Sequence, residues 1–184
     1  SGTHALPIFL TSPLTARDGL RQGQADLGVF AKSLGNLDLT GDGLSDIDPN
    51  RVHFVGLSLG AIAGLAQAKY NPNVKTVSVV APGGVLTDLL LNSTQLGPII
   101  RGGVLASFAS NPATSDWPNN GTIFNNLFRE IQTIVDPGDP ANHICECATL
   151  KPLHLVRVNG DTVVPNSSTD YLVTAGGLRQ LSTL

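Results

Sequence analysis

The sequence predicts an α/β fold, in which a parallel sheet carries helices on both of its faces. Three short β-branched and apolar runs, at residues 52–55, 74–80 and 153–158, have the composition of strands that are buried on both sides. A stretch of small, helix-forming residues at 59–70 separates the first two runs. Strand, helix and strand in so short a span are typical of a βαβ unit, which pairs its strands in parallel.

An amphipathic helix is predicted ahead of these strands, over residues 14–34. Five apolar side chains recur there at helical spacing and fall on one face, namely Leu20, Leu27, Phe30, Ala31 and Leu34. Gly35 and Asn36 follow at once, and both residue types commonly end a helix.

The segment that joins the second strand to the third differs in character from both. Apolar stretches at 85–91 and 123–135 alternate with loops rich in Asn, Pro and Gly. The segment is far too long for an ordinary strand-to-strand crossover. We therefore predict one domain over residues 1–184, with a helical cap inserted at about 85–150.

The composition excludes several classes of function. Charged residues make up only 14% of the 184 residues, the net charge is −3, and Lys and Arg form no cluster, so nothing favours binding of nucleic acid. No apolar run is long enough to span a membrane. Cys145 and Cys147 are too close for an unstrained disulfide and lack the other ligands of a zinc site. They are expected to be unpaired thiols, unless one pairs with a segment outside this chain.

The sequence Gly56-Leu57-Ser58-Leu59-Gly60 matches G-x-S-x-G, the pattern of a nucleophile elbow. Its context is the one that the motif requires, because a predicted strand precedes it and a predicted helix follows it. The sharp turn would lift the Ser58 hydroxyl above the sheet edge, where the Leu59 N–H at the helix N-terminus would stabilise an oxyanion. We therefore predict an α/β-hydrolase-type fold with Ser58 as the nucleophile. For the pentapeptide alone, a plain strand-to-helix turn is the alternative.

A serine hydroxyl needs a base, and the base needs a carboxylate that orients it. In this fold the acid follows the serine along the chain, and the histidine follows the acid. Asp161, in the turn after the third strand, is the best candidate for the acid, and Asp88 is the reserve. The alternative for Asp161 is a turn aspartate that caps its own backbone.

No histidine follows Asp161. His53 and His154 lie inside predicted strands, His143 precedes the acid and His4 is at the start of the chain, so all four are expected to be structural. We therefore expect an incomplete domain. The catalytic histidine and the early strands, with the second oxyanion donor, would come from missing N-terminal and C-terminal segments of a parent protein.

An acidic loop, residues 38–48, follows the first helix. Its residues have the spacing of a calcium-binding loop, with the candidate ligands Asp38, Thr40, Asp42, Leu44 and Asp46. Pro49 takes the place of the usual bidentate glutamate. A structural calcium and a solvated loop of Asx turns are the two alternatives.

Several segments together carry a resemblance to a known family. They are residues 15–22 (TARDGLRQ), the acidic loop, 51–60, 79–84 (VVAPGG), 132–140 (QTIVDPGDP) and 160–166 (GDTVVPN), and they cover most of the chain in matching order. The chain thereby resembles bacterial extracellular lipases of the virulence-factor type, which are α/β-hydrolases. One departure lies in the elbow, where the family usually has a histidine beside the serine and this chain has Leu57.

The resemblance implies Ser58 as the nucleophile, Asp161 as the acid, and lipid esters or lysophospholipids as substrates. It also implies a protein that is exported by a Gram-negative bacterium or held at its outer surface. The expected function is hydrolysis of a carboxylic ester by a lipase or esterase, through an acyl-enzyme and without a redox cofactor. Apolar segments in the cap favour a lipid-like acyl chain. The alternative is a catalytically incomplete fragment or a binding domain without a working triad.

Overall fold

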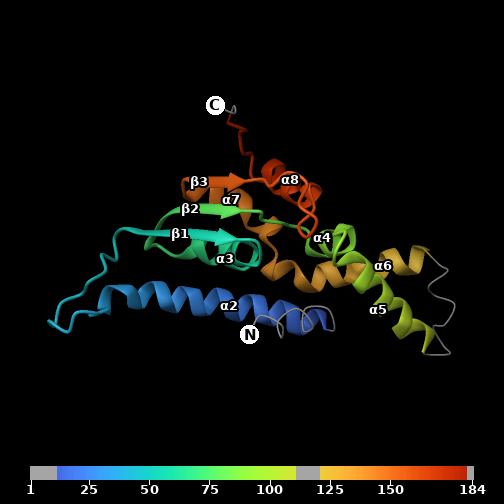
Figure 1. Cartoon of the computed structure of the whole chain (residues 1–184), viewed down its shortest axis with the longest axis horizontal. Coiled ribbons are helices and arrows are strands. Elements are labelled where there is room, and N and C mark those ends of the chain that lie inside the picture. The colour runs from blue at the N-terminus through green and yellow to red at the C-terminus, as the bar shows by residue number, and fades with distance from the viewer. Residues whose placement is uncertain (1–11, 111–120, 182–184) are drawn as a thin grey trace.

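A parallel three-stranded sheet forms the centre of the molecule. In this computed structural model, which describes residues 12–110 and 121–181, the strand order is β1 (Val52–Leu57), β2 (Val74–Val80), β3 (Leu153–Val156). Figure 1 shows the three arrows side by side and pointing toward the same end of the molecule. The predicted parallel sheet of these three strands is confirmed.

Two strand ends differ from the prediction. β1 runs on to Leu57, because its last two residues pair with the end of β2. β3 ends at Val156 rather than at Val158. The reason is that Val156 pairs with Val80, the last residue of β2, so the sheet offers no partner beyond it.

Helices flank and connect the strands. In chain order they are α2 (Pro13–Ser33), the short 3₁₀ helix η1 (Leu34–Asn36), α3 (Leu59–Tyr70), α4 (Leu86–Asn92), α5 (Gly97–Ala109), α6 (Gly121–Val135), the 3₁₀ turns η3 (Asp136–Gly138) and η4 (Pro140–Asn142), α7 (Ile144–Leu150) and α8 (Asn166–Ala175). The helices predicted at 14–34 and 59–70 are confirmed. Ser12 begins the first of them, since its hydroxyl accepts the Thr15 N–H at 3.3 Å and Pro13 follows it.

The main core lies between one face of the sheet and helices α3, α7 and α8. Val77 and Val79 of β2 pack there against Leu65, Ile144 and Leu172, one from each helix, and all five are essentially buried. α7 therefore lies beneath the sheet, although it belongs to the segment predicted as the cap. Of the helices, α4, α5 and α6 project farthest beyond the carboxyl ends of the strands (Figure 1).

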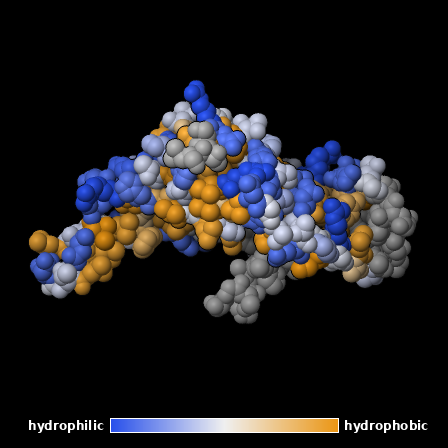
Figure 2. All heavy atoms as spheres, turned by 45° about the horizontal axis from the view of Figure 1, so that its top comes forward, coloured by the Kyte–Doolittle hydropathy of each residue, from blue (hydrophilic) through white to orange (hydrophobic). Residues whose placement is uncertain are grey.

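The opposite face of the sheet is open at β1. Val55 and Leu57 are 73% and 67% exposed, and His53 and His154 on the same face are exposed as well. The sequence predicted helices on both faces, whereas the helices of the main core pack on one. Figure 2 shows hydrophobic surface (orange) across the left and centre of the view, the half that holds the strands. Parallel sheets are normally covered on both faces, so the exposure of apolar side chains on this face is unusual.

A buried aspartate fixes the start of α4. Asp139 is fully buried, and its carboxylate accepts the N–H groups of Val85 at 3.1 Å, Leu86 at 2.7 Å and Ala141 at 2.8 Å, and the Gln132 amide at 2.8 Å. These bonds hold Val85 in the left-handed region, with φ of 55°, which a β-branched residue rarely adopts. The projecting helices are thus anchored to the main body by polar contacts as well as apolar ones.

Two further findings concern membrane crossing and the thiols. Among the described residues, no helix has the length and apolar character needed to cross a membrane. Both cysteines are free thiols, Cys145 exposed and Cys147 buried, and burial raises the pKa of the Cys147 thiol.

Candidate active site

Ser58 stands in the sharp turn between β1 and α3. Its backbone has φ of 48° and ψ of −117°, a conformation that non-glycine residues rarely adopt and that costs about 1–3 kcal/mol. The Ser58 N–H donates to the Val80 carbonyl of β2 at 2.9 Å, and the Ser58 carbonyl accepts from Ala61 and Ile62 at 2.9 and 3.0 Å. The strain is therefore held by bonds to the neighbouring strand and to the first turn of the helix.

The two glycines of the motif differ in whether the surrounding structure leaves room for a side chain. A Cβ on Gly56 would lie 2.7 Å from the Cα of Ala61 and 2.9 Å from the carbonyl oxygen of Gly60, and backbone atoms cannot move aside as a side chain would. A Cβ on Gly60 would meet nothing within 4 Å. Close approach of strand and helix therefore requires glycine at position 56.

Leu59 occupies the first position of α3, where backbone N–H groups have no partner inside the helix. In the described part of the chain, no acceptor is hydrogen-bonded to the Leu59 N–H. This donor lies beside Ser58 at the positive end of the helix dipole. Its position suits stabilisation of negative charge that develops next to the serine.

The two acid candidates occupy different surroundings. Asp161 is half-buried in the turn after β3, and one carboxylate oxygen accepts the N–H groups of Val163 and Val164 at 2.8 and 3.0 Å. Its other oxygen takes no hydrogen bond from the residues that the structure describes. Asp88 is exposed in the first turn of α4, where it accepts from the Asn92 amide at 2.8 Å. Asp161 therefore caps its own turn with one oxygen and keeps the second for another partner.

Ser58 and Asp161 lie at the same edge of the sheet. Ser58 follows β1, Asp161 follows β3, and β2 lies between these two parallel strands. Because the carboxyl ends of parallel strands lie at one edge, the sheet places both of the turns that the sequence singled out at that edge.

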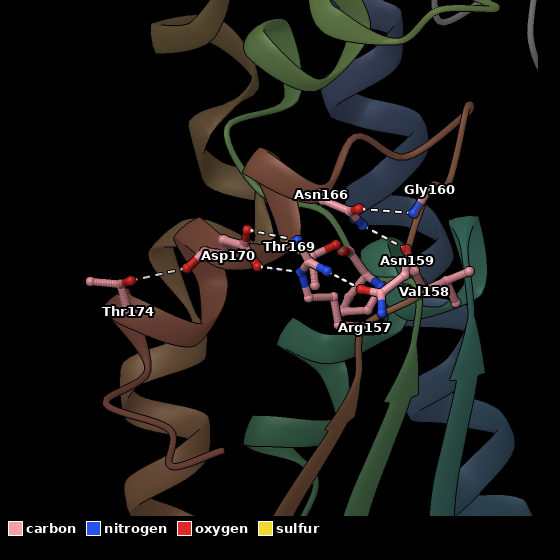
Figure 3. A network of polar contacts seen from close by, with 9 residues as sticks. Arg157, Val158, Asn159, Gly160, Asn166, Thr169, Asp170 and Thr174 are labelled. Carbon is pink, nitrogen blue, oxygen red and sulfur yellow. Dashed lines mark hydrogen bonds and ion pairs between the residues drawn. The ribbon is translucent and has the colours of Figure 1, made fainter. Parts of the chain in front are cut away.

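A side-chain network holds the Asp161 turn onto α8 (Figure 3). Arg157 donates two hydrogen bonds to the carboxylate of Asp170, at 2.6 and 3.2 Å, and a third to the side chain of Asn159. The bonds to Asp170 raise the pKa of Arg157. A two-bond contact between arginine and a carboxylate fixes the relative orientation of the two groups as well as their distance. The position of Arg157, just after β3, is therefore fixed relative to α8.

Asn166 closes the same turn from its far end. Its amide accepts the Gly160 N–H at 3.0 Å and donates to the Val158 carbonyl at 2.6 Å (Figure 3). Gly160 has φ of 72°, a conformation in which glycine is favoured. Asn166 therefore links the end of this turn to Val158 and Gly160 at its start.

The connection between α4 and α5 also holds this turn, through the residue that follows Asp161. The Thr162 carbonyl accepts from the hydroxyls of Ser93 and Thr94, at 3.2 and 3.0 Å, and from the Gln95 N–H at 3.3 Å. The Gln95 amide donates to the Thr162 hydroxyl at 2.9 Å. No local sequence pattern predicts these positioning residues, because their partners are distant in the chain. The adjacent Asn159 and Gly160 were the available local signal of a fixed turn.

None of the described histidines is hydrogen-bonded to the candidate nucleophile or acid. His53 and His154 lie on the open face of the sheet, with Nδ1 2.8 Å from the Thr76 hydroxyl and 3.1 Å from the Ser78 hydroxyl. His4 lies outside the described residues.

His143 belongs to a separate polar cluster with the buried Lys69. The Lys69 ammonium donates to Glu146 at 2.6 Å and lies 3.3 Å from Nδ1 of His143. Because an ammonium can only donate, Nδ1 accepts, and the ring proton sits on Nε2, which donates to the Pro137 carbonyl at 3.2 Å. Burial lowers the pKa of Lys69, but bonds to Glu146 and Tyr70 raise it above its ordinary value, so the lysine stays charged.

The candidate calcium ligands lie in the exposed loop between η1 and β1. They are Asp38, Thr40, Asp42, Leu44 and Asp46. The Asp38 carboxylate accepts the N–H groups of Gly43 at 2.8 Å and Gly41 at 2.6 Å, which lower the pKa of Asp38. The Thr40 hydroxyl lies 3.5 Å from Asp38 and 3.4 Å from Asp46. No group of three or more His, Cys, Asp or Glu side chains that could hold a metal gathers within residues 12–110 and 121–181. Calcium stays a prediction.

Neither a protein-family model nor a curated protein matches this chain. The structure itself shows a mixed α/β fold, with a small three-stranded parallel sheet and helices packed around it.

Proposed function

We propose that this chain carries the nucleophile and the acid of a serine ester hydrolase of the α/β-hydrolase kind, acting on lipid esters. The observation that carries the proposal is the strained backbone of Ser58, with φ of 48° and ψ of −117°, between a parallel strand and a helix. A plain strand-to-helix turn has no need of a strained non-glycine residue. Strain of this kind concentrates at sites where a side chain must be presented in one direction.

The proposed reaction is acyl transfer through Ser58. The hydroxyl oxygen attacks the ester carbonyl, the alcohol leaves, and water then releases the carboxylic acid from the acyl-enzyme. The Leu59 N–H stabilises the oxyanion at each step. The unbonded oxygen of Asp161 orients a base, which takes the serine proton and returns it to the leaving alcohol. The reaction uses no redox cofactor.

The base and the second oxyanion donor are proposed to come from further segments of a parent protein. The described histidines make other contacts, and the open face at Val55 and Leu57 supports an additional layer over the sheet. The resemblance to extracellular lipases of the virulence-factor type belongs to the same proposal. The proposal also includes export of the parent protein to the exterior or the outer surface of a Gram-negative bacterium.

Fluorophosphonate labelling of the parent protein tests the proposal, since only an activated serine reacts rapidly. We expect a single adduct at Ser58, with both the adduct and ester turnover lost in Ser58→Ala. Ser78→Ala is the matched control, because Ser78 is a described serine that does have a histidine neighbour, His154 at 3.1 Å. Turnover that persists in Ser58→Ala, or an adduct at Ser78, would refute the assignment.

The second candidate function is that of a domain that keeps this fold without working catalysis. It is favoured by the contacts of the described histidines, which include neither Ser58 nor Asp161. Residues 1–184 by themselves are expected to hydrolyse p-nitrophenyl esters negligibly, because loss of one triad member costs several orders of magnitude in rate. Rapid turnover by the isolated chain would show that a base is already present.

A further inference from the structure

An apolar cavity of about 70 Å³ lies among helices α2, α4, α5 and α6. Its walls include Ala16, Leu90, Val104, Phe128 and Ile131, and none of its lining residues is charged. A water molecule needs roughly 10–15 Å³ of such space, but it also needs two to four polar partners. The Thr87 hydroxyl, the side-chain polar group of the lining, already donates to Gln132 at 2.9 Å. The cavity therefore suits a hydrocarbon group better than water.

The cavity borders an apolar cluster that also packs beside both candidate catalytic turns. Leu86 and Val135 line the cavity and also belong to an apolar cluster with Ile62 and Val164. Ile62 lies in the first turn of α3, and its N–H bonds the Ser58 carbonyl. The N–H of Val164 bonds the Asp161 carboxylate. Apolar packing thus connects the cavity to the turn of the nucleophile and to the turn of the acid.

We infer that the cavity binds the hydrocarbon end of the acyl chain of the ester. This inference rests on the proposed function for the ester, whereas binding of an alkyl chain as such rests on the cavity alone. Each methylene removed from water should raise affinity about fourfold, until the cavity is filled. A fatty acid, the product of the proposed reaction, should therefore bind with an affinity that rises with chain length and then levels off.

The dependence of affinity on chain length can be measured in the full chain. The assay is displacement of bound cis-parinaric acid by butanoate, hexanoate, octanoate and decanoate. Val104→Phe, which fills the cavity from α5, is expected to weaken octanoate binding at least tenfold. Leu105→Phe is the matched control, because Leu105 is on the same helix, 38% exposed and outside the lining, and it should bind octanoate as the unchanged chain does. Val104→Ala enlarges the cavity and should move the levelling-off to a longer chain, a result that overpacking cannot produce.

Three results would overturn the inference. They are unchanged octanoate binding in Val104→Phe, no dependence on chain length, and loss of binding in Val55→Ser, which would place the ligand on the open face of the sheet. Ser58→Ala should bind octanoate normally, which separates the inference from the proposed function. If Ser58 is labelled but Val104→Phe has no effect, only the inference fails. If chain binding follows Val104 but Ser58 stays unlabelled, the proposed function fails and the alkyl-binding cavity remains.

Discussion

The turn that carries Ser58 and the turn that carries Asp161 lie at one sheet edge but are held in different ways. The Ser58 turn is held by its own backbone, which bonds to the end of β2 and to the first turn of α3. The Asp161 turn is held by side chains, through the Arg157–Asp170 pair and through hydrogen bonds from the α4–α5 connection to Thr162. One turn is thus specified locally and the other by residues far along the chain.

The two turns differ in which substitutions would destabilise them. The Ser58 turn depends on steric room beside one glycine, and atoms of a packed backbone cannot yield. The Asp161 turn depends on polar contacts that water partly screens, and each such contact contributes little alone. Substitutions in the first turn should therefore cost more stability than substitutions in the second.

The largest effect is expected for Gly56→Ala. The added Cβ would meet the Ala61 backbone at 2.7 Å, so the free energy of unfolding should fall by about 1–3 kcal/mol. Gly60→Ala is the control, with open space around its Cβ and a helix position that favours alanine, so it should be neutral or slightly stabilising. Urea unfolding followed by circular dichroism measures both. Equal losses in the two variants would contradict the steric account.

The loop of residues 38–48 extends the comparison to a turn held by carboxylates. If it binds Ca²⁺, a free Ca²⁺ concentration of about ten times the dissociation constant should stabilise the folded chain by about 1.4 kcal/mol. Its melting temperature should rise accordingly. Asp38→Asn should abolish that rise, because Asp38 is a candidate ligand. A melting temperature that Ca²⁺ leaves unchanged would decide for the Asx-turn alternative.

Strain at Ser58 predicts an unusual order of stability. Ser58→Gly should be more stable than Ser58→Ala by about 1 kcal/mol, because glycine adopts a φ of 48° without steric cost. Ser78 in the middle of β2 is the control, where glycine weakens a strand and the order should be reversed. Thermal unfolding of the four variants checks this. Alanine as the better residue at both positions would mean that the elbow is unstrained.

The smallest effect on stability is expected for the Arg157–Asp170 pair. The two side chains are 38% and 52% exposed, so a double-mutant cycle with Arg157→Ala and Asp170→Ala should give a coupling of about 0.2–1 kcal/mol. The coupling should shrink in high salt, because screening acts on exposed charges. A large coupling that salt does not change would show that the acid turn is as rigidly specified as the nucleophile turn.

Much of the fold could be predicted because its signals are local. The run at 74–80 and the helix at 59–70 agree with β2 and α3 at both ends, since β-branched residues and Asn-Pro punctuation mark them. The end of β3 could not be predicted, because Val158 is as apolar as the strand residues before it. Only the length of the neighbouring strand stops the pairing at Val156.

Local sequence patterns were enough to locate the three strands, the helix that follows Ser58 and the residues of the two turns. Period and composition within a few neighbouring residues suffice for these features. Long-range packing settled which face of the sheet is open and that α7 packs on the other face. It also decided that Arg157, Asp170 and the α4–α5 connection hold the acid turn. These features depend on contacts between segments far apart in the chain, and no local pattern of residues encodes which distant segments will meet.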